Sequence, residues 1–235
     1  MNKNTRHDQY AQWSKNWKSL RDMPDVDFKE VLKAWKAHVP DPGYRTTWQE
    51  LFGYRHNHPR GQERGEQIIE RNFLPDQSGQ PRMHRLIREN LEIQVMGLAH
   101  QMPMAQQRQG QVIADCLGTI QCGERTHPVA VEIKDTHANP WHAVIENLQQ
   151  VRMLRANVRN VQEFFKNRKG IHHFKGSWGM VLAPKRYFEK HKNVLDRSVR
   201  LSDFLRQKTE ARIMFVTTDE IGQSVLRHVG GYWPL

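Results

Sequence analysis

Two apolar runs between residues 111 and 134 constrain the fold of this chain more than any other feature. The first run carries Asp115 among small and branched apolar residues, and the second, 129–134, ends in Glu132-Ile133-Lys134. Side chains alternate along a strand, so the branched residues of the second run share one face while Glu132 and Lys134 share the other. The pattern predicts two neighbouring strands that carry a compact acidic site with a lysine at its edge.

The residue types at this site indicate a particular chemistry. The carboxylates of Asp115 and Glu132 are oxygen ligands of the kind that Mg²⁺ or Mn²⁺ prefers. The ammonium group of Lys134 would offset negative charge on a phosphate or position an attacking water. The alternative is that Glu132 and Lys134 form a solvated face of an edge strand. Asp115, the turn and the helix that follows favour the site.

These residues resemble the core motif of the PD-(D/E)XK nuclease superfamily. That motif has an aspartate, a spacer, then Glu or Asp, any residue and Lys, and it is matched by Asp115, sixteen intervening residues and Glu132-Ile133-Lys134. Ala114 stands where the family name has proline. The resemblance covers roughly residues 80–217. It implies an α/β, restriction-endonuclease-like mixed sheet flanked by helices, and metal-dependent hydrolysis of phosphodiester bonds, with DNA as the expected substrate.

The resemblance also implies a further glutamate on the first core helix. Apolar residues in 83–96 recur at helix-compatible spacing, although 93–96 would also fit a strand. Glu89 is therefore the predicted third acidic residue, with Glu92 as the alternative. Helical phase does not separate the two, and a solvent-facing carboxylate is equally consistent with each.

A helix is predicted directly after Lys134. Asn139 is placed to cap it and Pro140 to occupy its first turn, so the helix should run from Trp141 to about Asn157. In the exonuclease branch of the family, a glutamine on this helix is followed four residues later by tyrosine. That tyrosine is missing here, so the branch is not supported. Of the two glutamines in this position, Gln149 and Gln150, one is expected to contact a metal-bound water or a phosphate, and Gln149 is the one selected.

The same helix carries three arginines at intervals of three and four residues, which we call the arginine stripe: Arg152, Arg155 and Arg159. Such spacing places them on one helix face. A solvated face is the ordinary outcome for a charged stripe, but a helix beside the acidic site also favours contact with a nucleic-acid backbone.

The remaining elements predict an α/β layer with at least one parallel strand pair. Strands are expected at 176–184 and 211–217, with a basic helical segment, 185–208, between them. Asp219-Glu220 is predicted to open a terminal helix that ends at Gly230-Gly231.

The N-terminal part, 1–78, is predicted to be a helical appendage to a nuclease-like domain at 79–235. A helix is expected at 25–39 and a second one from Thr47, where a capping box is present. Tryptophan is concentrated here, and packing in a small helical core is favoured over base stacking for Trp13, Trp17, Trp35 and Trp48.

Composition agrees with a polyanionic partner. Thirty-six Lys and Arg against twenty-five Asp and Glu give a formal net charge of +11. There is no apolar run of about eighteen residues, so no membrane span is expected. The two cysteines, Cys116 and Cys122, indicate reduced thiols and a cytoplasmic protein. A homodimer is one expected assembly.

The sequence therefore predicts a nuclease that uses Mg²⁺ or Mn²⁺ bound by Asp115 and Glu132. Two alternatives from other classes stay open. One is a catalytically silent nucleic-acid-binding module with the same fold. The other is an assembly scaffold that binds protein through its N-terminal helices, which would require a large exposed apolar patch on residues 1–80.

Overall fold

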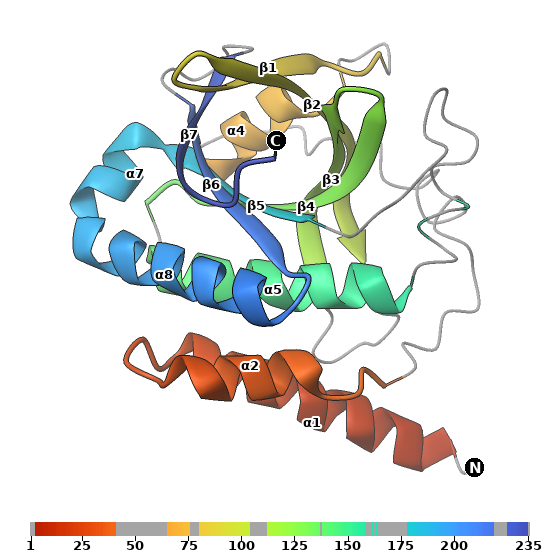
Figure 1. The fold of residues 1–235 in the computed structure, drawn as a ribbon. Helices are drawn as coiled ribbons and strands as arrows, with labels where there is room; N and C mark the ends of the chain where they lie inside the picture. Colours follow the sequence, from red (N-terminus) through yellow and green to blue (C-terminus); the bar gives the residue numbers. More distant parts are fainter. Residues whose placement is uncertain are drawn as a thin grey trace.

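A computed structural model describes residues 3–40, 65–75, 80–103, 112–136, 138–157, 161, 163, 178–218 and 225–234. Its described elements begin with helices, continue with four strands in succession, and then combine helices and strands (Figure 1). The helices are α1 (Lys3–Arg21), α2 (Phe28–Lys36), α4 (Glu66–Phe73), α5 (Pro140–Ala156), α7 (Lys185–Lys190) and α8 (Lys192–Lys208). The strands are β1 (Met83–Arg88), β2 (Leu91–Pro103), β3 (Ile113–Cys122), β4 (Arg125–Ile133), β5 (Trp178–Pro184), β6 (Arg212–Thr218) and β7 (Val225–Gly231).

The described strands close into a barrel in the order β1-β2-β3-β4-β5-β6-β7, with β7 returning to β1. The pairs β4–β5, β5–β6 and β7–β1 are parallel, and the others are antiparallel. The predicted restriction-endonuclease-like open mixed sheet is therefore wrong. The parallel strands and the α5 crossover between β4 and β5 agree with the α/β pattern, but the sheet has no open edge at β1 or β7.

The error has a local origin in two segments that were predicted to be helical. Residues 83–96 form the β1–β2 hairpin, and residues after 219 contribute β7. In β1 the buried residues are His84 and Leu86, which is the period of two that a strand shows. Leu86 lies opposite Leu226 in the parallel β1–β7 pair, and this pairing closes the barrel. The two incorrectly predicted segments are thus the ones that convert an open sheet into a closed one.

The barrel interior is filled by apolar side chains and by α4. The apolar side of α4 packs into it through Ile69 and Phe73, and His84 Nε2 lies 3.0 Å from the carbonyl oxygen of Phe73. Gly97 of β2 faces that same carbonyl so closely that a Cβ would collide with it. The strands contribute Leu86, Val95, Cys116, Ile120, Val129, Val131, Ile133, Met180, Leu182, Met214, Val216 and Leu226.

A second core lies outside the barrel. Helix α5 lies across β4 and β5, α8 packs beside it, and α1 and α2 cover these two helices (Figure 1). Trp13, Trp17 and Trp35 are buried in this layer, as predicted, whereas Trp48 lies outside the described residues. The predicted helix that begins at Thr47 also lies outside them.

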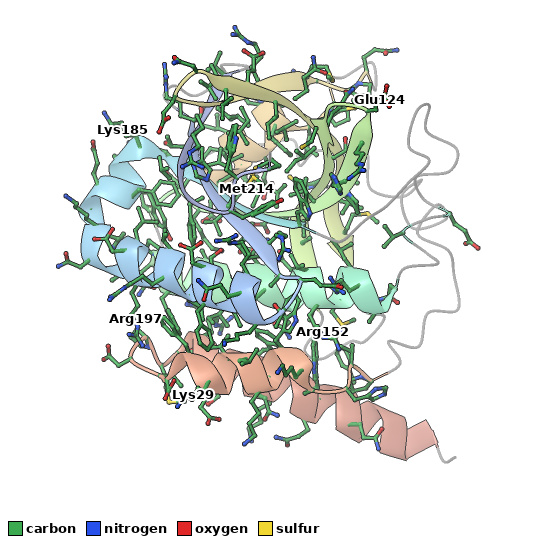
Figure 2. The ribbon with its side chains drawn as sticks, viewed as in Figure 1. Lys29, Glu124, Arg152, Lys185, Arg197 and Met214 are labelled. Carbon is green, nitrogen blue, oxygen red and sulfur yellow. The ribbon has the colours of Figure 1, made fainter. Side chains whose placement is uncertain are left out.

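The N-terminal helices are held against this layer by polar contacts as well as by apolar packing. Arg197 of α8 donates to the carbonyl oxygens of Pro24 and Val26, at 2.5 and 2.7 Å. Trp141 Nε1 donates to the Leu20 carbonyl at 3.0 Å. Figure 2 shows Arg197 and Arg152 where the N-terminal pair meets the α5–α8 layer. None of the helices in the described part of the chain is long and apolar enough to cross a membrane.

Candidate active site

The structure brings Asp115, Glu132 and Lys134 together where β3 and β4 lie side by side. The strands are antiparallel with Cys116 opposite Val131, and the Asp115 carboxylate accepts a hydrogen bond from the Ile133 amide at 2.7 Å. The alternation of β4 places its branched residues in the barrel and Glu132 on the outer face, toward α5. Sequence reasoning predicted this arrangement of the three residues.

Glu132 is a carboxyl group with only 3% of its surface exposed. It lies 2.5 Å from Lys134 Nζ and accepts a second, short hydrogen bond from Gln150 Nε2. Burial raises its pKa well above the usual range, and the neighbouring charge of Asp115 raises it further. Glu132 therefore needs a cation or a proton to remain in this position.

Lys134 lies between two carboxyl groups. Its Nζ atom is 3.2 Å from Glu146 in addition to its contact with Glu132. Burial acts to lower the pKa of Lys134, but the neighbouring carboxylates outweigh burial and raise it above the usual value. Lys134 is therefore an ammonium group at physiological pH, and it acts as a charge and a hydrogen-bond donor.

Helix α5 contributes Glu146, which sequence reasoning missed, and Gln150, which it named only as the alternative to Gln149. The carboxyl group of Glu146 lies 2.8 Å from Arg21 of α1 and 3.3 Å from His142, one turn earlier on α5. Burial acts to raise the pKa of Glu146, but the hydrogen bond from His142 and the charge of Lys134 outweigh it and lower the pKa. The four-residue spacing of Glu146 and Gln150 on a helix that follows the motif was the available signal.

Gln150 links the strands of the site. Its Nε2 atom donates to the carbonyl oxygen of Ile113 at 2.9 Å as well as to Glu132, and its Oε1 accepts from Asn147 at 3.0 Å. Gln149, the predicted residue, lies on the same pocket wall, with Nε2 3.5 Å from Ser14 of α1. The glutamine that contacts the acidic centre is thus one position further along the helix than predicted.

The pKa of Asp115 is raised to about 6. Burial is the main cause, and the charges of Glu70 and Glu66 add to it, while Lys134 and the Ile133 amide act in the opposite direction. Both glutamates belong to α4, and Glu70 lies 2.7 Å from His100 of β2. Helix α4 therefore supplies two acidic neighbours of Asp115 that sequence reasoning did not select.

The structure does not bring Glu89 or Glu92 to the site. Glu89 occupies the β1–β2 turn with a left-handed φ of 54°, and Glu92 forms an exposed ion pair with Arg85 at 2.6 Å. Asp115 lies opposite the other end of β2, because Cys116 pairs with His100. About ten strand residues separate the two ends of β2, a distance on the order of 30 Å.

Two members of the arginine stripe have partners within the protein. Arg152 donates to the carbonyl oxygens of Trp35 and Ala37, at 2.8 and 3.2 Å, where α2 ends. Arg155 forms a short ion pair with Glu210. Arg159 lies outside the described residues. The predicted backbone contact of the stripe stays a prediction, and for Arg152 it would compete with a structural role.

A cavity of about 400 Å³ opens over the acidic centre. Its walls come from α1, from β3 and β4, and from α5, so the N-terminal helix forms part of the site. The residues that line it are Ser14, Trp17, Lys18, Arg21, Val112, Ile113, Asp115, Glu132, Lys134, Ile145, Glu146, Gln149 and Gln150.

The donor set suits a hard divalent cation. Asp115 and Glu132 line one cavity, and the charge of Asp115 raises the pKa of Glu132, a repulsion that a bound cation would relieve. Among the described residues, no group of three or more His, Cys, Asp or Glu side chains is arranged to hold a metal. Mg²⁺ is commonly bound through one or two carboxylates, with water and substrate phosphate completing its shell. Asp115 and Glu132 are the carboxylates of this cavity that could hold such a cation.

Comparison of the chain with protein-family models, with curated proteins and with solved structures finds no match.

Proposed function

We propose that this protein is a divalent-metal-dependent nuclease that hydrolyses phosphodiester bonds, with DNA as the expected substrate. The observation that carries the proposal is the convergence of Asp115, Glu132 and Lys134 in one cavity, with Glu132 almost fully buried. Buried carboxyl groups destabilise a fold unless they are compensated, so a cluster of them in a cavity favours a chemical role. The similarity to the PD-(D/E)XK motif supports the chemistry of the site, and it does not extend to the fold.

The proposed cation is Mg²⁺ or Mn²⁺, held by the carboxylates of Asp115 and Glu132. A bound cation of this kind would polarise the scissile phosphate and lower the pKa of a coordinated water. Glu132 must lose its proton when the cation binds, since only the carboxylate is a ligand. Cation affinity should therefore increase with pH over the range in which Glu132 ionises.

The other groups of the cavity have distinct roles in this proposal. Lys134 keeps its proton, so it stabilises negative charge on the phosphate and orients the attacking water without accepting a proton from it. Gln150 holds Glu132 against β3 through its bond to the Ile113 carbonyl. Glu146 balances the charge of Lys134.

The test is incubation of the purified protein with single-stranded and duplex DNA and RNA, in the presence of Mg²⁺, Mn²⁺ or a chelator. We expect cleavage that requires the divalent cation and disappears with the chelator. Glu132→Gln should lose cleavage while it still binds nucleic acid. A wild-type protein that cleaves none of these substrates with either cation would contradict the proposal.

A catalytically silent nucleic-acid-binding module is the second candidate. The observation that favours it is the set of contacts that tie Lys134 to Glu132 and Glu146, because such a network also fits a fixed structural role. The assembly-scaffold alternative required a large exposed apolar patch on residues 1–80. Within the described residues of that range, Met23 is the exposed large hydrophobic side chain, and the aromatic residues face the core.

A further inference from the structure

Helix α1 contributes one complete face to the cavity over the acidic centre. Ser14, Trp17, Lys18 and Arg21 recur at intervals of three, four and seven residues, so they lie along one side of the helix, and all four line the cavity. The helix packs on α5 (Figure 1), which also lines the cavity. Any ligand that reaches Asp115 and Glu132 therefore comes within reach of α1.

The α1 side of the cavity carries positive charges, whereas Asp115, Glu132 and Glu146 on the other side are acidic. Arg21 is bound to Glu146 at 2.8 Å, and Lys134 is bound to Glu132 and Glu146. Lys18 is exposed, lines the same cavity, and has no carboxylate partner among the described residues. An incoming anion would therefore pair with Lys18 before it pairs with Arg21.

The size of the cavity restricts the form of the substrate. A volume of about 400 Å³ is at the small end of the range for sites that enclose a small molecule. It accommodates a phosphate with the sugar or base beside it, and α1 stands along one side of it, so a flexible single strand has easier access to the acidic centre than a rigid duplex.

Helix α1 is also fixed in place. Trp141 donates to the Leu20 carbonyl at its C-terminal end, and Arg197 binds the connection that follows at Pro24 and Val26. Tyr10, Trp13 and Trp17 are buried on the side that faces the core. These contacts favour a permanent wall over a segment that moves aside to admit a duplex.

We infer that α1 is a substrate clamp, which binds a single nucleic-acid strand against the acidic centre through Lys18, with Arg21 beside it. This inference rests on the proposed function for the identity of the ligand. It assigns the N-terminal helices to the active site, and it limits the substrate to single strands, frayed ends or flaps.

The experiment compares two lysines of α1. Lys18 lines the cavity, whereas Lys15 is equally an exposed lysine of this helix but does not line it. The affinity of wild type, Lys18→Ala and Lys15→Ala for a short fluorescent single-stranded DNA is measured by anisotropy, with Ca²⁺ in place of Mg²⁺ to prevent turnover. A blunt duplex of the same sequence is the second probe, and a salt titration is recorded for each protein.

We expect Lys18→Ala to weaken single-strand binding about tenfold and to flatten the salt dependence by up to ~0.7, the slope for one phosphate contact on a single strand. Lys15→Ala should match wild type, and the duplex should bind more weakly than the single strand. Circular dichroism confirms that each variant is folded.

Three outcomes would overturn the inference. Equal losses in both variants would mean that α1 contributes only general positive charge. Tighter binding by Lys18→Ala would mean that α1 obstructs the site. A duplex that binds and is cut as well as the single strand would exclude a single-strand clamp.

Failure of the nuclease proposal would look different from any of these. Binding that depends on Lys18 without any divalent-dependent cleavage would contradict the nuclease and leave the clamp intact. Cleavage that is unaffected by Lys18→Ala would contradict the clamp and leave the nuclease intact.

Discussion

The two faces of β4 show how one strand serves stability on one side and chemistry on the other. Val129, Val131 and Ile133 point into the barrel and belong to its apolar core. Glu132 points outward and is buried to nearly the same degree, yet it is surrounded by Lys134, Gln150 and the charge of Asp115. Apolar burial stabilises the fold, whereas a buried ionic network is often replaceable by apolar residues without loss of stability.

The difference suggests what each region contributes. The barrel interior needs volume and shape, and any apolar set that fills it would suffice. The outer face retains a cluster that tends to destabilise the protein, which is typical of a functional site. Substitutions on the two faces should therefore separate folding from function.

The largest expected effect distinguishes adjacent residues of β4. Glu132→Gln keeps the side-chain shape and removes the charge, so divalent-dependent cleavage should fall by about 1,000-fold or more while thermal stability is unchanged or higher. Asp115→Asn should behave similarly. The matched control is Val131→Ala, which should lower the free energy of unfolding by about 2 kcal/mol and preserve activity per folded molecule. Unfolding by denaturant and initial rates of cleavage are measured on the same preparations.

Wild-type cleavage by Glu132→Gln, or loss of cleavage by folded Val131→Ala, would remove the distinction between the two faces.

Lys134 should show the next largest effect. Lys134→Ala removes an ammonium group from the proposed reaction centre, so turnover should slow by about 100-fold. Affinity for Mg²⁺ or Mn²⁺, measured by calorimetry, should be retained or increased, because the two carboxylates lose a competing positive charge. A variant that no longer binds the cation but still turns over normally would contradict the role assigned to Lys134.

Substitutions in the arginine stripe should have smaller effects than those at Lys134. They test which of these arginines stabilise the fold and which contact nucleic acid. Arg152→Ala removes two hydrogen bonds to carbonyl groups at the end of α2, so the free energy of unfolding should fall by about 1–2 kcal/mol. Arg155→Ala should cost under about 1 kcal/mol, because its partner Glu210 is exposed. Arg159→Ala should flatten the salt dependence of duplex binding by up to ~0.9 if it contacts a phosphate. An unchanged slope for all three would make the stripe an ordinary protein surface.

The smallest expected effect concerns the pH dependence of the stability of the barrel. Burial lowers the pKa of His228 to about 4, with the charge of Arg88 acting in the same direction. The unfolded state then binds the proton more tightly, so stability is complete above the unfolded value of about 6.5 and falls as the pH decreases toward about 4. Between pH 7 and pH 5 the loss should be roughly 1 kcal/mol after allowance for partial exposure.

His228→Gln should remove this part of the pH dependence, which denaturant titrations at the two pH values would measure. If the stability of the variant depends on pH as that of wild type does, the pH dependence comes from other groups. The buried His84 is the first of these to examine.

Local patterns were sufficient for the elements that carry the motif. Strict alternation with two charges identified β4, and Asn139 and Pro140 marked the start of α5, where the Asn139 side chain does accept a hydrogen bond from the amide of His142. The same kind of reasoning failed for 83–96, because short apolar runs fit both periods and the β1–β2 turn has no glycine to mark it. Glu89 was selected on the assumption that this segment was a helix.

What the sequence determined by itself is therefore that Glu132 and Lys134 share one side of their strand, since alternate residues of a strand face the same way whatever the fold. Asp115 joins them because a short turn pairs β3 with β4. Closure of the barrel was decided only by tertiary structure, because the pairing of β1 with β7 joins segments from opposite ends of the domain. The same holds for the places of α4 and α1 beside the site. Each reaches the acidic centre through packing between distant segments, and such contacts leave no periodic trace in the sequence.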